Sequence, residues 1–245
     1  RYRSLGQCDL QGQQLRAAFE LQGSEYCRMK KAFLIILSIF LCGCGKMAGS
    51  VLPPVGPVAP SPADLEAYKH EVNSDYIGLL EIEGLLEENV VQGEDNNEYL
   101  SVSWDRQEDS SGAIFLDFLN TLNDQNLIMY GHYVYADEDK RFSPLEKLMD
   151  EDNYEAYKNI TLTLSDETRN YVITDVFKAG VDDTTLSYYL PAYEPEYFVS
   201  YYEAVGSASL YSTPHDLTTD DTWLTLQTCV RNEPDQRLVI LARQI

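Results

Sequence analysis

The sequence contains few cysteines and histidines, and its cysteines are unevenly placed. Of the five cysteines, Cys8, Cys27, Cys42 and Cys44 lie in the first 44 residues, and only Cys229 follows them. The chain after residue 44 therefore cannot form a disulfide within itself, and it cannot build a cysteine-rich metal site. If the protein is exported, a single leftover cysteine indicates a reactive thiol.

Positive charge is also scarce. The 245 residues include 18 Lys and Arg against 40 Asp and Glu, which gives a net charge of -22. Residues 1–44 hold six Lys and Arg and three Asp and Glu, so the remainder carries -25. So acidic a body argues against nucleic acid as a partner and against adhesion of this part to an anionic membrane. The acidic clusters at 137–139 and 150–152 lack the alternating spacing of a calcium loop, so we expect solvated surface and no metal site.

The N-terminal region has an apolar run that is too short for a membrane span. Ala32 to Leu41 covers about ten residues, whereas a spanning helix needs roughly 20. Met29 and two lysines precede this run, so 29–44 is predicted to be a signal peptide. Its end resembles a bacterial lipobox with Cys44 as the lipidated residue, and an uncleaved signal anchor is the alternative.

The segments on either side of the signal peptide have different compositions. Residues 1–28 lack periodicity, and we interpret them as an upstream or non-native extension. Residues 45–62 include five prolines between Val51 and Pro62 and predict a stiff tether. Residues 63–245 are predicted to be one folded domain.

This domain is predicted to be mainly β, with a few helices between short strands. Ser61-Pro62 predicts a helix start, with Leu65, Tyr68 and Val72 on one face. Further helices are expected from Pro144 to Met149 behind a capping box at Ser143, from Glu151 to Lys158, and after Pro195. Strands are expected at Ile77–Ile82, Ile114–Leu116, Leu127–Tyr130, Ile160–Leu164, Tyr171–Phe177, Leu224–Thr228 and Leu238–Leu241. Many short strands with peripheral helices favour a closed barrel.

Three chemically active side chains stand at the ends of predicted strands. Cys229 closes one apolar run, Arg237 opens the next, and His132 ends a third. A thiol, an imidazole and a guanidinium are the parts of a cysteine acyl-transfer site. Taken alone, Cys229 is more often a small buried hydrophobe, and Arg237 more often pairs with a local acid such as Glu233 or Asp235.

The segments around these residues resemble those of sortases, the thiol transpeptidases of Gram-positive cell surfaces. Thr225-Leu226-Gln227-Thr228-Cys229 is similar to the family's TLxTC signature, Arg237 stands at the family arginine, and Tyr130-Gly131-His132 resembles the histidine segment. Asp75–Ile82, Val91–Asn96 and Gly112–Asp117 resemble the upstream segments. Order and spacing are most similar to class B sortases over roughly residues 64 to 243, with a helix-bearing insertion before the cysteine strand. The resemblance implies the closed mixed β-barrel of sortases.

Two positions depart from the class B pattern. Gln227 stands where a small residue is usual, and Tyr133-Val134 where asparagine and methionine often follow the histidine. We expect Gln227, Thr228 and Tyr133 to border the substrate groove, so the departures affect which signal is recognised and leave the reaction class intact.

The resemblance implies roles for the three side chains and for partners. Cys229 is the expected nucleophile, His132 the general acid/base and Arg237 the oxyanion or substrate holder, with no metal and no cofactor. The expected substrates are surface proteins with a C-terminal sorting signal, joined to a peptidoglycan or pilin amine at the outer face of the cytoplasmic membrane. His215, in a turn, is the rival base. The alternative is a non-catalytic surface lipoprotein that binds sorted proteins.

Overall fold

The structure is a computed structural model, and it describes residues 61–245. The predicted extension, signal peptide, Cys44 lipidation site and most of the proline-rich tether lie outside these residues. The described residues include no helix long and apolar enough to cross a membrane.

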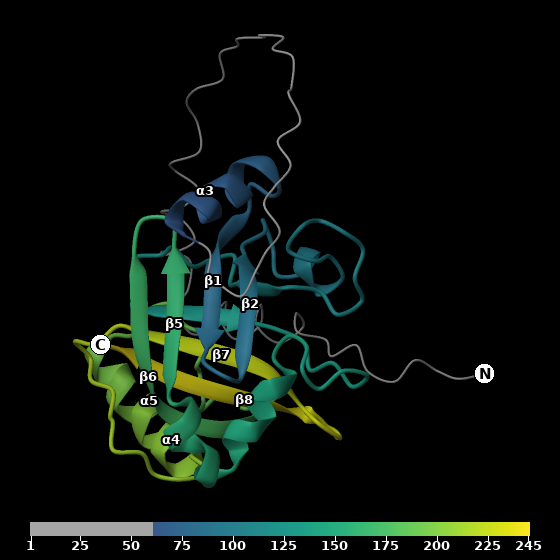
Figure 1. The fold of residues 1–245 in the computed structure, drawn as a ribbon. Coiled ribbons are helices and arrows are strands. Elements are labelled where there is room, and N and C mark those ends of the chain that lie inside the picture. The colour runs from purple at the N-terminus through teal and green to yellow at the C-terminus, as the bar shows by residue number, and fades with distance from the viewer. Residues whose placement is uncertain (1–60) are drawn as a thin grey trace, which may run out of the picture.

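Eight strands form a closed barrel in the order β1-β2-β3-β4-β7-β8-β6-β5, and β5 pairs back onto β1 (Figure 1). Two contacts, β2 with β3 and β4 with β7, are parallel and the others antiparallel, so the barrel is mixed. The strands are β1 Tyr76–Ile82, β2 Leu86–Val91, β3 Ile114–Leu116, β4 Asn126–Tyr130, β5 Asn159–Leu164, β6 Thr168–Gly180, β7 Trp223–Val230 and β8 Glu233–Gln244. The predicted closed barrel is confirmed.

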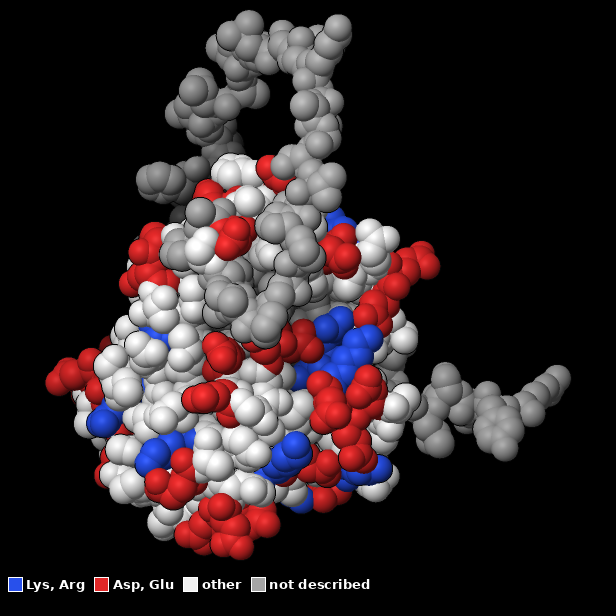
Figure 2. All heavy atoms as spheres, viewed as in Figure 1, with Lys and Arg blue, Asp and Glu red and all other residues white. Residues whose placement is uncertain are grey.

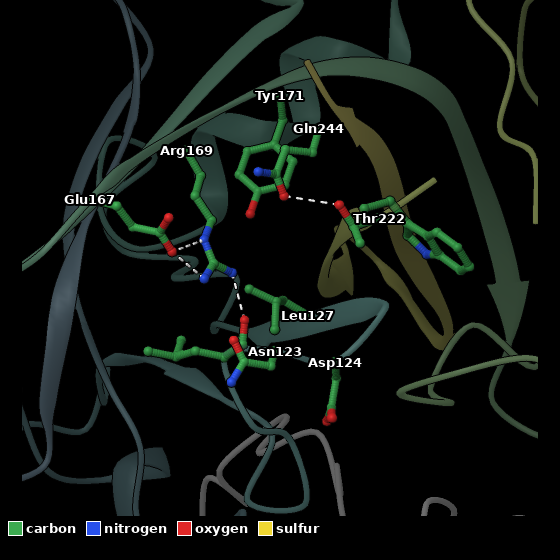
Figure 3. Close-up of a pocket in the computed structure, with 10 residues that line it drawn as sticks. Asn123, Asp124, Leu127, Glu167, Arg169, Tyr171, Thr222 and Gln244 are labelled. Carbon is green, nitrogen blue, oxygen red and sulfur yellow. Dashed lines mark hydrogen bonds and ion pairs between the residues drawn. The ribbon is translucent and has the colours of Figure 1, made fainter. Parts of the chain in front are cut away.

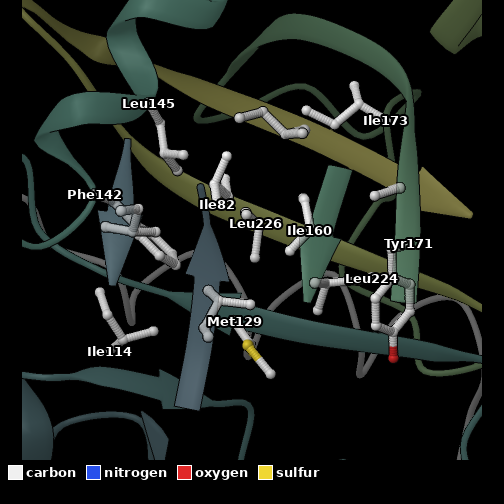
Figure 4. Close-up of a cluster of buried hydrophobic side chains, with 14 of the residues drawn as sticks. Ile82, Ile114, Met129, Phe142, Leu145, Ile160, Tyr171, Ile173, Leu224 and Leu226 are labelled. Carbon is white, nitrogen blue, oxygen red and sulfur yellow. The ribbon is translucent and has the colours of Figure 1, made fainter. Parts of the chain in front are cut away.

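The barrel interior is filled mostly by aliphatic side chains from alternate strand positions, together with aromatic residues such as Phe142 and Tyr171 (Figure 4). On β7 these are Leu224 and Leu226, with Val230 at the strand end, and on β8 they include Leu238 and Ile240. Because successive side chains of a strand point to opposite faces, the residues between them point outward. This alternation directs Cys229 and Arg237 to the outer face of the barrel.

Helical segments cover parts of the outer surface. They are α3 Pro62–Glu71, η1 Glu98–Leu100, η2 Ser143–Met149, η3 Glu151–Asn153, α4 Tyr154–Tyr157 and α5 Pro195–Ala208. The helix α3 lies beside one end of β1, and α5 lies on the other side of the molecule (Figure 1). The connection from β6 to β7, which includes α5, packs an aromatic cluster with Tyr193, Phe198 and Tyr201 against Trp223 and Val239. This cluster covers the outer face of β7 and β8.

The helix predictions are partly confirmed. Ser61 caps α3 with a reciprocal bond to Asp64, as a capping box requires. The predicted capping box at Ser143 is wrong, because Ser143 Oγ accepts a bond from the Val134 amide and η2 has no side-chain cap. That segment is a 3₁₀-helix, and the helix expected from Glu151 to Lys158 is divided into η3 and the one-turn α4. The sequence does not predict β2, because the polar residues Glu87, Glu88 and Asn89 interrupt the apolar pattern of this strand.

Candidate active site

The register of two antiparallel strands brings Arg237 beside Cys229. The two residues are direct cross-strand partners on β8 and β7. Directly opposed residues keep their Cβ atoms roughly 5 Å apart on one face of the sheet. Both side chains are buried, at 6% and 3% exposure. Arg237 Nη1 donates to the carbonyl oxygens of Pro234 (3.0 Å) and Gln236 (3.1 Å), which hold the guanidinium at the start of β8.

Parallel pairing brings His132 to the same place. β4 and β7 pair up to Tyr130 opposite Gln227, and the Gly131 amide then donates to the Gln227 carbonyl at 3.2 Å. His132 and Cys229 each lie two residues beyond that last pair, so both are directed to the outer face. The structure thus gathers the three residues from positions as far apart as 132 and 237 in one corner of the barrel.

The bond partner of His132 determines which ring nitrogen titrates. Nε2 lies 2.9 Å from the carbonyl oxygen of Leu100. Because a carbonyl oxygen only accepts, Nε2 carries a hydrogen in this arrangement and Nδ1 is the nitrogen that gains or loses a proton. Burial lowers the pKa of His132, the Leu100 bond and Asp109 raise it, and the positive charge of Arg141 lowers it, with a net decrease from 6.5.

Cys229 is the only cysteine among residues 61–245, so no disulfide can form within this part of the chain. Nucleophilic chemistry requires the reduced thiolate. Assays of this site therefore need a reductant.

The three groove candidates are all buried. Gln227 points to the outer face with Cys229, whereas Thr228 alternates to the barrel interior, where its hydroxyl has no hydrogen-bond partner. Tyr133 donates its hydroxyl hydrogen to Glu146 at 2.7 Å, and burial, followed by Glu146, raises its pKa to about 12. Their roles in substrate recognition stay predictions.

The other two histidines lie away from this corner. His70 is on α3 and bonds Glu66 at 3.0 Å on the exposed helix surface. His215 lies in the turn before β7, next to Asp216, whose carbonyl accepts from Arg243, the partner of Trp223. Cys229 lies six positions after Trp223, which is about 20 Å along a strand. His215 is therefore badly placed to act on Cys229.

A polar pocket of about 270 Å³ also lies at that distant end of the barrel (Figure 3). Arg169 and Glu167 form one side of it and Gln244 and Thr222 another, with Tyr171 directed between them. The beginnings of β4 and β7 contribute to its wall, so it lies at the opposite ends of these strands from His132 and Cys229. It belongs to a different region from the candidate site.

Several residues around the site had no signal in the sequence. Leu100 contributes only its backbone carbonyl, so no side-chain pattern identifies it. Asn126 holds the segment that includes Tyr188 through bonds to the Tyr188 and Leu190 carbonyls. Asn126 and Tyr188 are 62 residues apart in the chain.

Comparison with known proteins agrees with this architecture. Residues 80–245 match the sortase domain family. The chain is 28% identical to sortase B of Staphylococcus aureus over 181 residues, which cover 71% of this chain and 72% of that protein. Sortase B of Clostridium perfringens has a similar structure, with a TM-score of 0.66 and 29% identity over 74% of this chain and 99% of that one. The S. aureus sortase B–substrate complex gives a TM-score of 0.67 at 25% identity, over 76% of this chain and 86% of the other.

The closed mixed barrel is thus shared with sortases. The chain belongs to the sortase family, and the similar structures are class B sortases.

Proposed function

We propose that this protein is a class B-like sortase that cleaves a C-terminal sorting signal and transfers the acyl product to an amine. The observation that carries the proposal is the convergence of Cys229, His132 and Arg237, from three neighbouring strands, on one outer corner of a sortase barrel. These are the nucleophile, proton donor and cationic clamp that such a reaction needs.

The residues divide the reaction between them. The Cys229 thiolate attacks the carbonyl carbon of the scissile peptide bond, and the guanidinium of Arg237 stabilises the oxyanion that forms. The intermediate collapses to a thioester when the leaving amine takes a proton from Nδ1 of His132. An incoming amine then attacks the thioester, gives its proton back to His132 and releases the thiolate of Cys229. If water attacks in its place, the result is hydrolysis.

We further propose that surface proteins are the substrates and that a peptidoglycan precursor or a pilin lysine supplies the amine. Membership of the sortase family supports transfer of an acyl group to an amine. The peptidoglycan amine and the pilin lysine are chemically similar, so either could accept the acyl group. The acidic exterior (Figure 2) suits a cationic nucleophile in general, because opposite charge speeds encounter. The proposed location is the outer face of the cytoplasmic membrane.

We propose that the membrane tether is formed by residues before the described domain. A signal peptide at 29–44 ending at a lipidated Cys44, followed by the proline-rich 45–62, would hold the catalytic domain 63–245 away from the surface. Stable anchoring by acyl groups requires more than one chain. Mass spectrometry of the N-terminus of the native protein tests this, because a chain that retains Met29 indicates an uncleaved anchor.

The function is tested by incubating the reduced protein with sorting-signal peptides and an amine nucleophile. Amine-dependent ligation products, lost in Cys229→Ala and in His132→Ala, are expected. Thermal unfolding of both variants serves as the folding control, since losing one sulfur at a strand end costs only about 1 kcal/mol. Ligation by folded Cys229→Ala would refute the proposal, and peptide binding without turnover by the wild type would favour the non-catalytic alternative.

A further inference from the structure

Arg141 is a buried arginine with an unusual backbone conformation close to His132. Its side chain is 10% exposed, and its φ of 55° lies in the left-handed region that non-glycine residues rarely adopt. Such a conformation is maintained only where surrounding contacts hold it. None of the reaction steps above uses this residue.

The contacts of Arg141 join three separate segments. Nη1 and the backbone amide both donate to Glu88 of β2, at 2.8 and 2.9 Å. Nε donates to the Gly112 carbonyl at 2.7 Å, and Nη2 to Asp109 at 3.0 Å. Lys140 adds a second cation on Asp109 at 2.9 Å. The guanidinium therefore connects β2, the 109–112 loop and the loop that follows His132.

The hydrogen bonds that hold the backbone and the ring of His132 both involve segments joined to this cluster. On one side, the Phe142 amide next to Arg141 donates to the His132 carbonyl at 3.2 Å, and Tyr133 forms a β-bridge with Arg141. On the other side is the Leu100 carbonyl that holds Nε2, and the Asp109 amide donates to the adjacent Ser101 carbonyl at 3.1 Å. Movement of Arg141 would loosen the histidine at its backbone and at its ring.

The charges of the cluster also act on His132. The positive charge of Arg141 disfavours the imidazolium and lowers the pKa of His132, while the negative charge of Asp109 favours it and raises that pKa. Glu88 holds Arg141 in place through two bonds. Cys229 and Arg237 on the neighbouring strands are directed to the same corner.

We propose that Arg141, held by Glu88 and Asp109, is the positioning residue that fixes His132 beside Cys229 and sets the pH range in which His132 works. This inference rests on the proposed function for the role of His132. The placement of His132 by Arg141 is independent of that function and can be measured without substrate.

The test combines titration of His132 with turnover. The imidazole signals of the three histidines are followed by NMR against pH in the reduced protein, and His132→Gln identifies the signal of His132. Arg141→Met is expected to move the titration of His132 to higher pH, because a positive neighbour is removed. Asp109→Asn is expected to move it to lower pH, because a negative neighbour is removed. Arg243→Met, the matched control, removes a positive charge opposite Trp223 at the far end of β7 and should leave the titration in place.

Turnover on a sorting-signal peptide gives the second measurement. The acidic limb of the kcat/KM profile should follow the NMR titration in each variant, and kcat of Arg141→Met should fall about tenfold to a hundredfold through misplacement of His132. Arg141→Lys keeps the charge and loses the forked grip, so it should lower kcat with a smaller displacement of the titration.

Shifts in the same direction for Arg141→Met and Asp109→Asn, or none in either, would overturn the proposal, because they would indicate a merely structural cluster. If the NMR shifts have opposite signs but no variant or wild type turns over peptide, the proposed function fails and the link between Arg141 and His132 stands.

Discussion

Gly131 stands immediately before His132 at a point where the barrel leaves no room for a side chain. A Cβ added there would lie 2.3 Å from Ile114 Cδ1 and 2.8 Å from Phe142 Cδ2, both in the core. Carbon atoms pack best at about 3.5–4.0 Å, so the Ile114 methyl would have to move by roughly 1 Å. Overpacking of a filled core costs typically 1–3 kcal/mol. We expect Gly131→Ala to lower the free energy of unfolding by about 2 kcal/mol and to reduce turnover by displacing His132.

The double variant Gly131→Ala with Ile114→Val isolates the cause. Valine lacks the Cδ1 methyl, and this truncation alone costs about 0.5–1.5 kcal/mol. If the clash is responsible, the two losses combine to less than their sum, as measured by denaturant unfolding of all four proteins. Gly206→Ala on α5 is the control, because nothing lies within 4 Å of its added Cβ, and helix propensity predicts a gain of up to about 1 kcal/mol. Unchanged stability of Gly131→Ala, or additive losses, would show that contact with Ile114 does not limit the side chain at position 131.

Three further predictions concern the ionisable groups. Arg237→Lys should lose most activity in the peptide ligation assay although the charge is kept, because lysine lacks a planar fork, and near-wild-type turnover would indicate simple charge stabilisation. Burial alone would raise the pKa of Asp109, but bonds from Ser111 and Lys140 lower it to about 2. Ionised Asp109 therefore stabilises the folded protein fully above the unfolded pKa of 3.8, and this stabilisation is lost as pH falls through about 2. The free energy of unfolding of Asp109→Asn should consequently depend less on pH in acid than that of the wild type. The kcat/KM profile should be a bell between the pKa of His132 and that of Cys229, and Gln227→Ser should change peptide preference more than this shape, whereas a rate rising to high pH without a falling limb would exclude protonated His132 as the acid.

The sequence identified the barrel and the three candidate catalytic residues because their signals are local. Alternating apolar residues locate β7 and β8, and a cysteine or histidine at the end of such a run can be recognised directly in the amino-acid sequence. The side-chain cluster of Arg141, Glu88 and Asp109 was not predicted, since its members are 53 and 32 residues apart and charged residues usually read as solvated surface. The 3₁₀ form of η2 was not predicted either, because Ser143 bonds Val134 from a neighbouring loop and not its own helix.

The packing of the aromatic cluster on β7 and β8 is a second feature that the sequence predicts only in part. Phe198, Tyr201 and Val205 are buried on α5, as the helical stripe predicts. Nothing in the stripe says that the helix packs beside Trp223 and Val239 on the outer face of the barrel. That placement depends on the path of the connection between β6 and β7, which only the three-dimensional structure supplies.

The central claim is that Cys229 carries the acyl group during the reaction. The most direct measurement is mass spectrometry of the reduced protein, quenched in acid during turnover of a sorting-signal peptide without added amine. We expect a mass increase equal to the acyl fragment, located on the peptide that contains Cys229 and released by hydroxylamine or by an amine nucleophile. Cleavage of the substrate with no adduct on Cys229, or with an adduct on another residue, would contradict it.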